Sequence, residues 1–234
     1  MLFPVSEWYS SIGNYTFPTM FIRLRPAEID ALLGAERYAP VAREVIQRLD
    51  YVIDHLPGLC FVHADVCAPS DTALFRQTDG AAHDGGTAWS MLMESEKVRA
   101  AFRERLTCRV AFHPYRRMDH NREFRMFVKG RQLKAMSQRF LTRHLPNLVA
   151  REQDIWGLGQ SLVANIGEFL PADDVTMDVY LTATGRLMVL DLNPFGPPTN
   201  PLLLRNWEQD WSKELGLKLL PRPIQLRGDV SVSF

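Results

Sequence analysis

Apolar and polar residues alternate along four segments in the middle and the C-terminal part of the chain. These segments are residues 122–128, 131–140, 176–181 and 186–193. A period of two is typical of β-strands, and short turns at residues 129–130 and 182–185 join the segments in pairs. The pattern therefore predicts two β-hairpins, each with one apolar face toward a core and one polar face.

Apolar residues recur at helical spacing in other segments. They predict helices at residues 27–33, 41–55, 94–106, 148–169 and 207–215. Gly157 and Gly159 interrupt the pattern of the segment 148–169. Buried strands are expected at residues 59–66 and 108–112. Residues 77–87 are polar and rich in glycine, which indicates either a flexible connection or a loop that folds over phosphates.

The polar face of the second hairpin gathers oxygen-bearing side chains. If Leu181 pairs with Arg186, then Asp178, Asp191 and Asn193 point in the same direction, because directly opposed residues share a face. Carboxylate and amide oxygens are hard ligands of the kind that Mg²⁺ binds. The pattern indicates either a Mg²⁺ site that carries a nucleotide phosphate or an ordinary hairpin with its polar face in water.

The polar face of the first hairpin is basic. Pairing Val128 with Arg131 places Arg125 directly opposite Lys134. Like charges opposed across two strands are unfavourable by up to about 1 kcal/mol. A phosphate between the two cations would remove this cost, and so in part would the neighbouring Glu123.

Composition and charge narrow the class of protein. The chain has 234 residues, of which 46% are hydrophobic and 23% charged, as in soluble globular proteins. It contains neither a run of about 18 apolar residues nor a signal-peptide pattern at its start, so we expect a cytoplasmic protein without a membrane partner. Residues 97–151 contain fifteen Lys or Arg against three acids, a net charge of +12 in a neutral chain. This block indicates a polyanionic ligand or arginines that only cover helix surfaces.

Three motifs appear in a fixed order along the chain. They are Glu123-Phe124-Arg125 with Phe127-Val128-Lys129, then Ser137-Gln138-Arg139, then the segment from Asp191 to Gly196. With them the sequence resembles the cell division cycle protein 123 (D123) family of ATP-grasp proteins, as a bacterial or phage-type member. The resemblance runs from Trp8-Tyr9 to Trp207-Glu208. It implies an α+β, ATP-grasp fold with two lobes, antiparallel sheets and flanking helices, and a nucleotide between lobes 1–111 and 112–234.

The resemblance also implies roles for the residues of both hairpins. Asp178, Asp191 and Asn193 would hold Mg²⁺, and Arg125 and Arg139 would reach the phosphates of ATP. Further ATP-binding residues are Glu123, Lys134 and Gln138, and Arg125 and Lys134 are the candidate catalytic residues. In the register above Arg139 lies on the apolar face, so its role requires a bulge or the end of the strand.

One departure from the family concerns a lysine. ATP-grasp proteins commonly place a lysine on the ATP phosphates from the segment that corresponds to residues 61–71, but this chain has His63 there. A histidine contacts phosphate only weakly at neutral pH, because its usual pKa is about 6.5. His63 either takes over this contact or bonds to the backbone of a buried strand, and Lys134 would supply the missing cation.

Three functions are compatible with these features. The favoured one is an ATP- and Mg²⁺-dependent ATP-grasp ligase that joins RNA ends by nucleotidyl transfer, with Arg116 and Arg117 as RNA contacts. Its basis is the basic block and a similarity to bacterial and phage ATP-grasp proteins. The alternatives are a non-catalytic, ATP-binding assembly factor for a translation initiation factor, and an ATP-grasp carboxylate–amine ligase.

Overall fold

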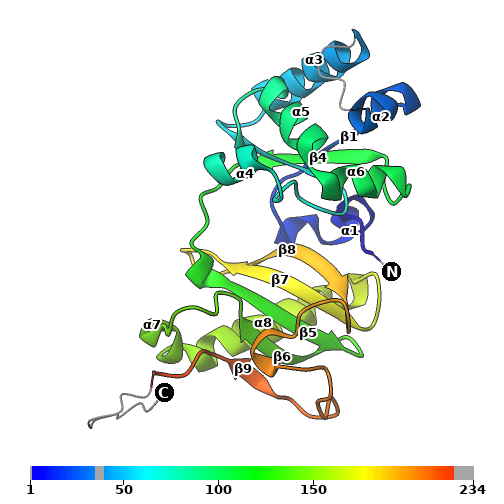
Figure 1. The fold of residues 1–234 in the computed structure, drawn as a ribbon. Helices are drawn as coiled ribbons and strands as arrows, with labels where there is room; N and C mark the ends of the chain where they lie inside the picture. The colour runs from blue at the N-terminus through cyan, green and yellow to red at the C-terminus, as the bar shows by residue number, and fades with distance from the viewer. Residues whose placement is uncertain (1, 35–39, 224–234) are drawn as a thin grey trace, which may run out of the picture.

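The computed structural model describes residues 2–34 and 40–223, which form two lobes that are each built on a β-sheet (Figure 1). The sheet of the first lobe is antiparallel, with the strand order β1-β4-β2-β3. Its strands are β1 (Met20–Arg23), β2 (Cys60–Ala64), β3 (Ala81–Ala82) and β4 (Arg109–Pro114). The sheet of the second lobe has the order β8-β7-β5-β6-β9, and only β9 runs parallel to its neighbour. Its strands are β5 (Glu123–Lys129), β6 (Gln132–Gln138), β7 (Val175–Leu181), β8 (Leu187–Pro194) and β9 (Gly216–Lys218).

Helices of the first lobe cover its sheet. They are α2 (Pro26–Leu33), α3 (Pro40–Asp54), α4 (Ala73–Thr78), α5 (Gly85–Glu94) and α6 (Glu96–Arg103). The apolar stripe of α3 is buried at Val45 and Leu49, as its helical spacing predicts. It packs in one core with Trp89 of α5 and with Val62 and Phe112 of the sheet.

The core of the second lobe lies between its sheet and α8 (Glu152–Ile166). Met126 and Met136 on the sheet and Ile155 on α8 belong to this core. The first helix, α1 (Val5–Ile12), packs into the same core through Trp8 and Ile12, although it precedes the first lobe in the sequence. The remaining helices are α7 (Pro146–Val149) and the 3₁₀ helices η1 (Gly13–Tyr15), η2 (His120–Arg122), η3 (Gly167–Phe169) and η4 (Leu202–Leu204).

The glycine-rich segment 77–87 does not form the loop that its composition predicts. Asp84 is the N-cap of α5, and its carboxylate accepts a hydrogen bond from Thr87 N at 2.6 Å. Gly85 N donates to Asp50 Oδ1 at 2.6 Å, and a Cβ at Gly85 would lie 2.4 Å from the Ile46 carbonyl oxygen. Gly85 is therefore needed for the close approach of α5 to α3, and the prediction of a loop was wrong.

Helix boundaries differ from the prediction in other places, and the predicted helix 148–169 is divided into α7, α8 and η3. Ser95 accepts a hydrogen bond from Val98 N at 3.2 Å and starts α6, so the predicted helix 94–106 begins two residues later. Residues 207–215 form no helix. The predicted lobe boundary after residue 111 falls inside β4 and stays a prediction. Within the described ranges, no helix is both long and apolar enough to span a bilayer.

Candidate functional site

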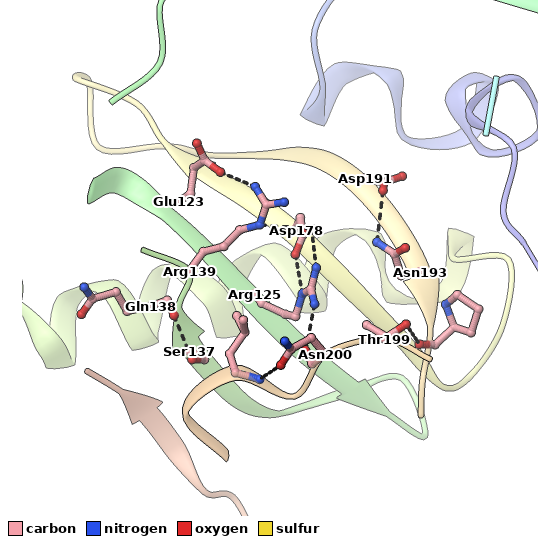
Figure 2. Close-up of polar contacts among 12 residues, drawn as sticks. Glu123, Arg125, Ser137, Gln138, Arg139, Asp178, Asp191, Asn193, Thr199 and Asn200 are labelled. Carbon is pink, nitrogen blue, oxygen red and sulfur yellow. Dashed lines mark hydrogen bonds and ion pairs between the residues drawn. The ribbon is translucent and has the colours of Figure 1, made fainter. Parts of the chain in front are cut away.

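One face of the second sheet, opposite the face that α8 covers, collects most of the predicted polar residues (Figure 2). Asp178 lies directly opposite Asp191, and Asn193 follows two positions later on the same face. Leu181 pairs with Leu187 and not with Arg186, and a bulge between Val179 and Asp178 shifts the pairing by one more residue. The convergence of the three oxygen-bearing side chains was predicted, and only their register differs.

The register of the first hairpin was predicted wrongly. Its two-residue turn is Gly130-Arg131, because both residues have the positive φ values, +56° and +58°, that a type I′ turn requires. A bulge then leaves Lys134 without a direct partner on β5. Arg125 lies opposite Ser137, and Lys134 Nζ donates to Gln132 Oε1 at 2.9 Å. The predicted opposition of Arg125 and Lys134 does not exist.

The same bulge exchanges the positions of two neighbouring residues. Arg139 lies on the polar face, where its backbone N bonds to the Glu123 carbonyl oxygen at 3.1 Å and its guanidinium reaches the Glu123 carboxylate. Gln138 lies on the other face and extends away from Arg139 (Figure 2). Its amide holds the backbone of Phe140, Arg143 and Leu220 and does not face the polar group.

Arg125 and Asp178 form a buried ion pair at the centre of this face. Arg125 Nε donates to Asp178 Oδ1 at 2.7 Å, and Nη2 donates to Oδ2 at 2.8 Å. Side-chain exposures of 10% and 5% keep water from the pair. Arg125 Nη1 donates to the Asn200 carbonyl oxygen at 2.8 Å, so all three guanidinium nitrogens have a partner in the protein.

Arg139 is the more accessible guanidinium, with 44% of its side chain exposed. Glu123 holds it on one side and also contacts His120 Nδ1 at 2.6 Å. Arg139 Nε lies 3.6 Å from Asp178 Oδ2. Burial alone would lower the pKa of Arg139, but the charges of Asp178 and Glu123 outweigh it and raise the pKa.

Asp191 lacks the compensation that Asp178 receives. Asn193 Nδ2 donates to Asp191 Oδ2 at 3.1 Å, and no salt bridge reaches Asp191 from the part of the chain that the structure describes. Burial, and next the charge of Asp178, raise the pKa of Asp191 to about 7. Among the described residues no three His, Cys, Asp or Glu side chains form a metal cluster, so a cation here would depend on two acids and one amide.

The first lobe contributes a group of ring side chains around His63 and His113. His63 Nδ1 contacts the Ala64 carbonyl oxygen at 2.7 Å, and burial lowers its pKa. His113 stacks on Phe61 at 4.9 Å and on Phe17 at 5.2 Å. Burial, and next the neighbouring His63, lower the pKa of His113 to about 4. Sequence reasoning missed Phe17, since no pattern links it to the distant strands.

Two further groups differ from the sequence analysis. Arg116 and Arg117 are exposed on the linker between β4 and η2, and neither forms an ion pair within the described ranges. Residues 195–215, which we name the strap, cross the polar face. Leu203 N donates to Ser137 Oγ at 3.2 Å, and Trp207 Nε1 donates to the Thr199 carbonyl oxygen at 3.0 Å. Within the strap the sequence predicted only a helix at residues 207–215, so the contact of the strap with Arg125 was not foreseen.

Comparisons with known proteins agree with this geometry. The sequence model of the D123 family matches residues 69–216. A putative CDC123-like protein of Acanthamoeba polyphaga mimivirus is 25% identical over 88% of this chain and 69% of its own length. A zebrafish translation initiation factor eIF2 assembly protein is 39% identical over 37% of this chain, but the match spans only 25% of the zebrafish protein. The solved structure of Cdc123 from Schizosaccharomyces pombe has a TM-score of 0.78 and 24% identity over 94% of this chain and 95% of its own.

These matches confirm the predicted α+β fold and overturn the predicted activity, and the ATP-grasp type of the fold stays a prediction. The vertebrate relatives bear the name of an assembly protein for eIF2 and not that of a ligase. The prediction of a ligase that joins RNA ends was therefore wrong. No match tests the individual roles given to Arg125 and Lys134 or to Arg116 and Arg117. The relatives named above are viral, vertebrate and fungal, so they give no support to a bacterial or phage-type member.

Proposed function

The chain belongs to the D123 family, and on that premise we propose that it is a non-catalytic, ATP-binding assembly factor for a translation initiation factor. The names of the vertebrate relatives support the partner, because each relative is described as an eIF2 assembly protein. The matched region is a short part of those proteins, so the partner of this chain is our inference. The cytoplasmic location expected from the sequence accords with this role and stays a prediction.

The proposal that the chain is not a catalyst rests on Arg125, because all three nitrogens of its guanidinium are bonded to protein groups. Enzymes that transfer phosphoryl or nucleotidyl groups depend on cations that face the charge developing on the transferred group. Here Arg125 binds Asp178 through two nitrogens and the strap, at Asn200, through the third. Lys134 lies at the bulge of β6 and donates to Gln132. The lowered pKa of His63 leaves the imidazole of His63 neutral at pH 7. The site is therefore better suited to bind a nucleotide than to catalyse its reaction.

Nucleotide binding would use both lobes. We propose that Arg139 contacts the phosphates, held in place by Glu123, because it is the guanidinium that stays accessible on this face. His113 and Phe61 offer stacked rings to the base, and His63 lies beside them, with its ring centroid 5.9 Å from that of His113.

A Mg²⁺ ion fits the donor set on β7 and β8. Asp191 and Asn193 would hold it, because their oxygens are hard ligands and no salt bridge reaches Asp191 from the described residues. Asp178 lies opposite as the second acid, although Arg125 occupies both of its oxygens. When bound, the ion would neutralise phosphate charge and so join the nucleotide to the acidic strands.

The test separates binding from turnover. Purified protein is incubated with Mg²⁺ and ATP, and we expect affinity in the titration and intact ATP after prolonged incubation. Asp191→Asn should weaken MgATP binding about tenfold, in the range seen when support for a metal is lost. Asp174→Asn is the matched control, because Asp174 pairs with Lys129 at the exposed end of the same sheet.

The partner is tested separately with purified eIF2 subunits. We expect the wild type to retain a subunit on a column more strongly with MgATP than without it. Steady release of ADP or AMP from wild type, or equal weak retention under both conditions, would contradict an ATP-binding assembly factor.

A further inference from the structure

Thr176 has a buried hydroxyl group with no partner, and it lies beside the oxygen ligands on β7 and β8. The residue is completely buried, and its Oγ1 makes no hydrogen bond in the structure. A hydroxyl group that loses water without gaining a partner costs about 1–3 kcal/mol. Such a group on a functional face indicates that something other than the protein satisfies it.

The strand register places Thr176 within the oxygen-rich group. Thr176 pairs with Asn193 on one side and with Phe127 on the other, and it is two residues before Asp178 on β7. The pairing is regular from Val175 to Asp178, so Thr176 and Asp178 share a face. Directly opposed side chains on a sheet lie about 5 Å apart at Cβ, which is close enough to share one bound water.

Complete burial limits what the hydroxyl can contact. Phe127, its other neighbour, belongs to an apolar cluster with Leu204 of the strap, and the aromatic side chains of Phe195 and Trp207 pack against that cluster. A closed position leaves no room for a bulky phosphate group, so the smallest polar partner, a single water, is the candidate. Mg²⁺ characteristically retains several of its waters when it binds protein carboxylates.

We propose that Thr176 is a further residue of the cation site and that its hydroxyl binds a water carried by a divalent cation on Asp191 and Asn193. The inference rests on the proposed MgATP binding and adds a residue that no motif identified. Partners in this outer position orient the bound ion, and their loss typically weakens a metal site by about 10–100-fold. Thr176 is thus a positioning residue.

Thr16 provides a matched control for the hydroxyl. It is also a buried threonine of this lobe, but its Oγ1 donates to the Val189 carbonyl oxygen of β8 at 2.8 Å. Replacement by valine keeps the shape of threonine and exchanges the hydroxyl for a methyl group. Thr16→Val should lower the melting temperature of the ligand-free protein, whereas Thr176→Val should keep or raise it, because the lost hydroxyl has no protein partner.

The deciding measurement is ATP affinity with Mg²⁺ and with EDTA. For Thr176→Val we expect the gain in affinity that Mg²⁺ provides to fall about tenfold or more, with no change in EDTA. Thr176→Ser should keep the gain, and Thr16→Val should leave it as in wild type.

Two results would overturn the proposal. One is a Thr176→Val protein that melts lower, as Thr16→Val does, and keeps the full effect of Mg²⁺, since the hydroxyl then has a structural role. The other is a wild type without Mg²⁺-dependent ATP binding, which removes the proposed function as well. If the wild type binds MgATP and the Thr176→Val protein binds it equally well, only the role of Thr176 is contradicted and the proposed function stands.

Discussion

Arg125 and Asp178 lie directly opposite each other on β5 and β7 and form two parallel hydrogen bonds, at 2.7 and 2.8 Å, almost out of reach of water. The geometry fixes both side chains, because a planar guanidinium matches a carboxylate edge to edge. The third bond of Arg125, to Asn200, connects this pair to the strap. One arginine therefore orients an acidic side chain and also holds the segment that crosses the site.

Breaking this pair should be costly because the remaining charge stays buried. We expect Arg125→Met to lower the free energy of unfolding by about 3–5 kcal/mol, since Asp178 would lose both of its short hydrogen bonds in a closed site and keep only Arg139 at 3.6 Å. The double variant Arg125→Met with Asp178→Leu should recover a large part of this loss, because no unpaired charge remains. Urea unfolding at pH 7 measures both effects. If the loss in the double variant equals the sum of the losses in Arg125→Met and in Asp178→Leu alone, the residues do not act as a pair.

Two glycines of α8 should respond oppositely to alanine. Gly157 has no heavy atom within 4 Å of a built Cβ, so Gly157→Ala should stabilise the helix by up to about 1 kcal/mol. At Gly159 a Cβ would lie 2.6 Å from Met136 Sδ and 2.9 Å from Leu133 Cδ2. Gly159→Ala should therefore destabilise by about 1–3 kcal/mol through overpacking. Thermal unfolding of the two variants, whose substituted positions are two residues apart on α8, checks the packing of α8 on the sheet.

The two hairpins could be predicted from alternation, but their registers could not. Asp191 and Asn193 converge with Asp178 as predicted, because Leu181 pairs one residue later than predicted and the bulge beyond Asp178 adds a second shift, so the total of two residues keeps the shared face. In the other hairpin the bulge at Lys134 lies between the turn and the functional residues, so every assignment beyond it is inverted. Arg139 and Gln138 exchange faces for that reason.

Glycine-rich composition also gave a wrong interpretation for a physical reason. Gly85 was read as part of a loop, whereas it allows α5 to approach the backbone of α3. Close approach depends on the partner helix, which is distant in sequence and sends no local signal. The contact of Asn200 with Arg125 is of the same kind, because the strap reaches the site only in the folded chain.

Acid should destabilise the first lobe through His113. Its pKa of about 4 in the folded protein lies below the value of about 6.5 expected for an unfolded histidine, so the unfolded chain binds the proton more tightly. The contribution to stability is present above pH 6.5 and is lost as the pH falls to about 4, by up to about 3 kcal/mol.

The control for this pH dependence is His113→Phe. Phenylalanine keeps a ring between Phe17 and Phe61 and cannot take up a proton. We expect the variant to lose clearly less stability than wild type between pH 6.5 and 4, with unfolding followed by urea at each pH. Parallel curves for the two proteins would assign the acid sensitivity to other groups, of which His63 is the nearest, because burial lowers its pKa also.

Arg139 and Lys134 should differ in their effect on nucleotide binding, although both are cations of β6 or its end. Arg139 lies on the polar face between Glu123 and Asp178, whereas Lys134 lies at the bulge and bonds to Gln132. We expect Arg139→Gln to weaken ATP binding about tenfold, which corresponds to 1.4 kcal/mol, and Lys134→Gln to leave it unchanged. Glu123 keeps His120 as a partner in the Arg139 variant, so the fold should survive. Titration calorimetry with ATP at two salt concentrations measures the difference, and a larger loss for Lys134→Gln would place the phosphates at the bulge instead of beside Arg139.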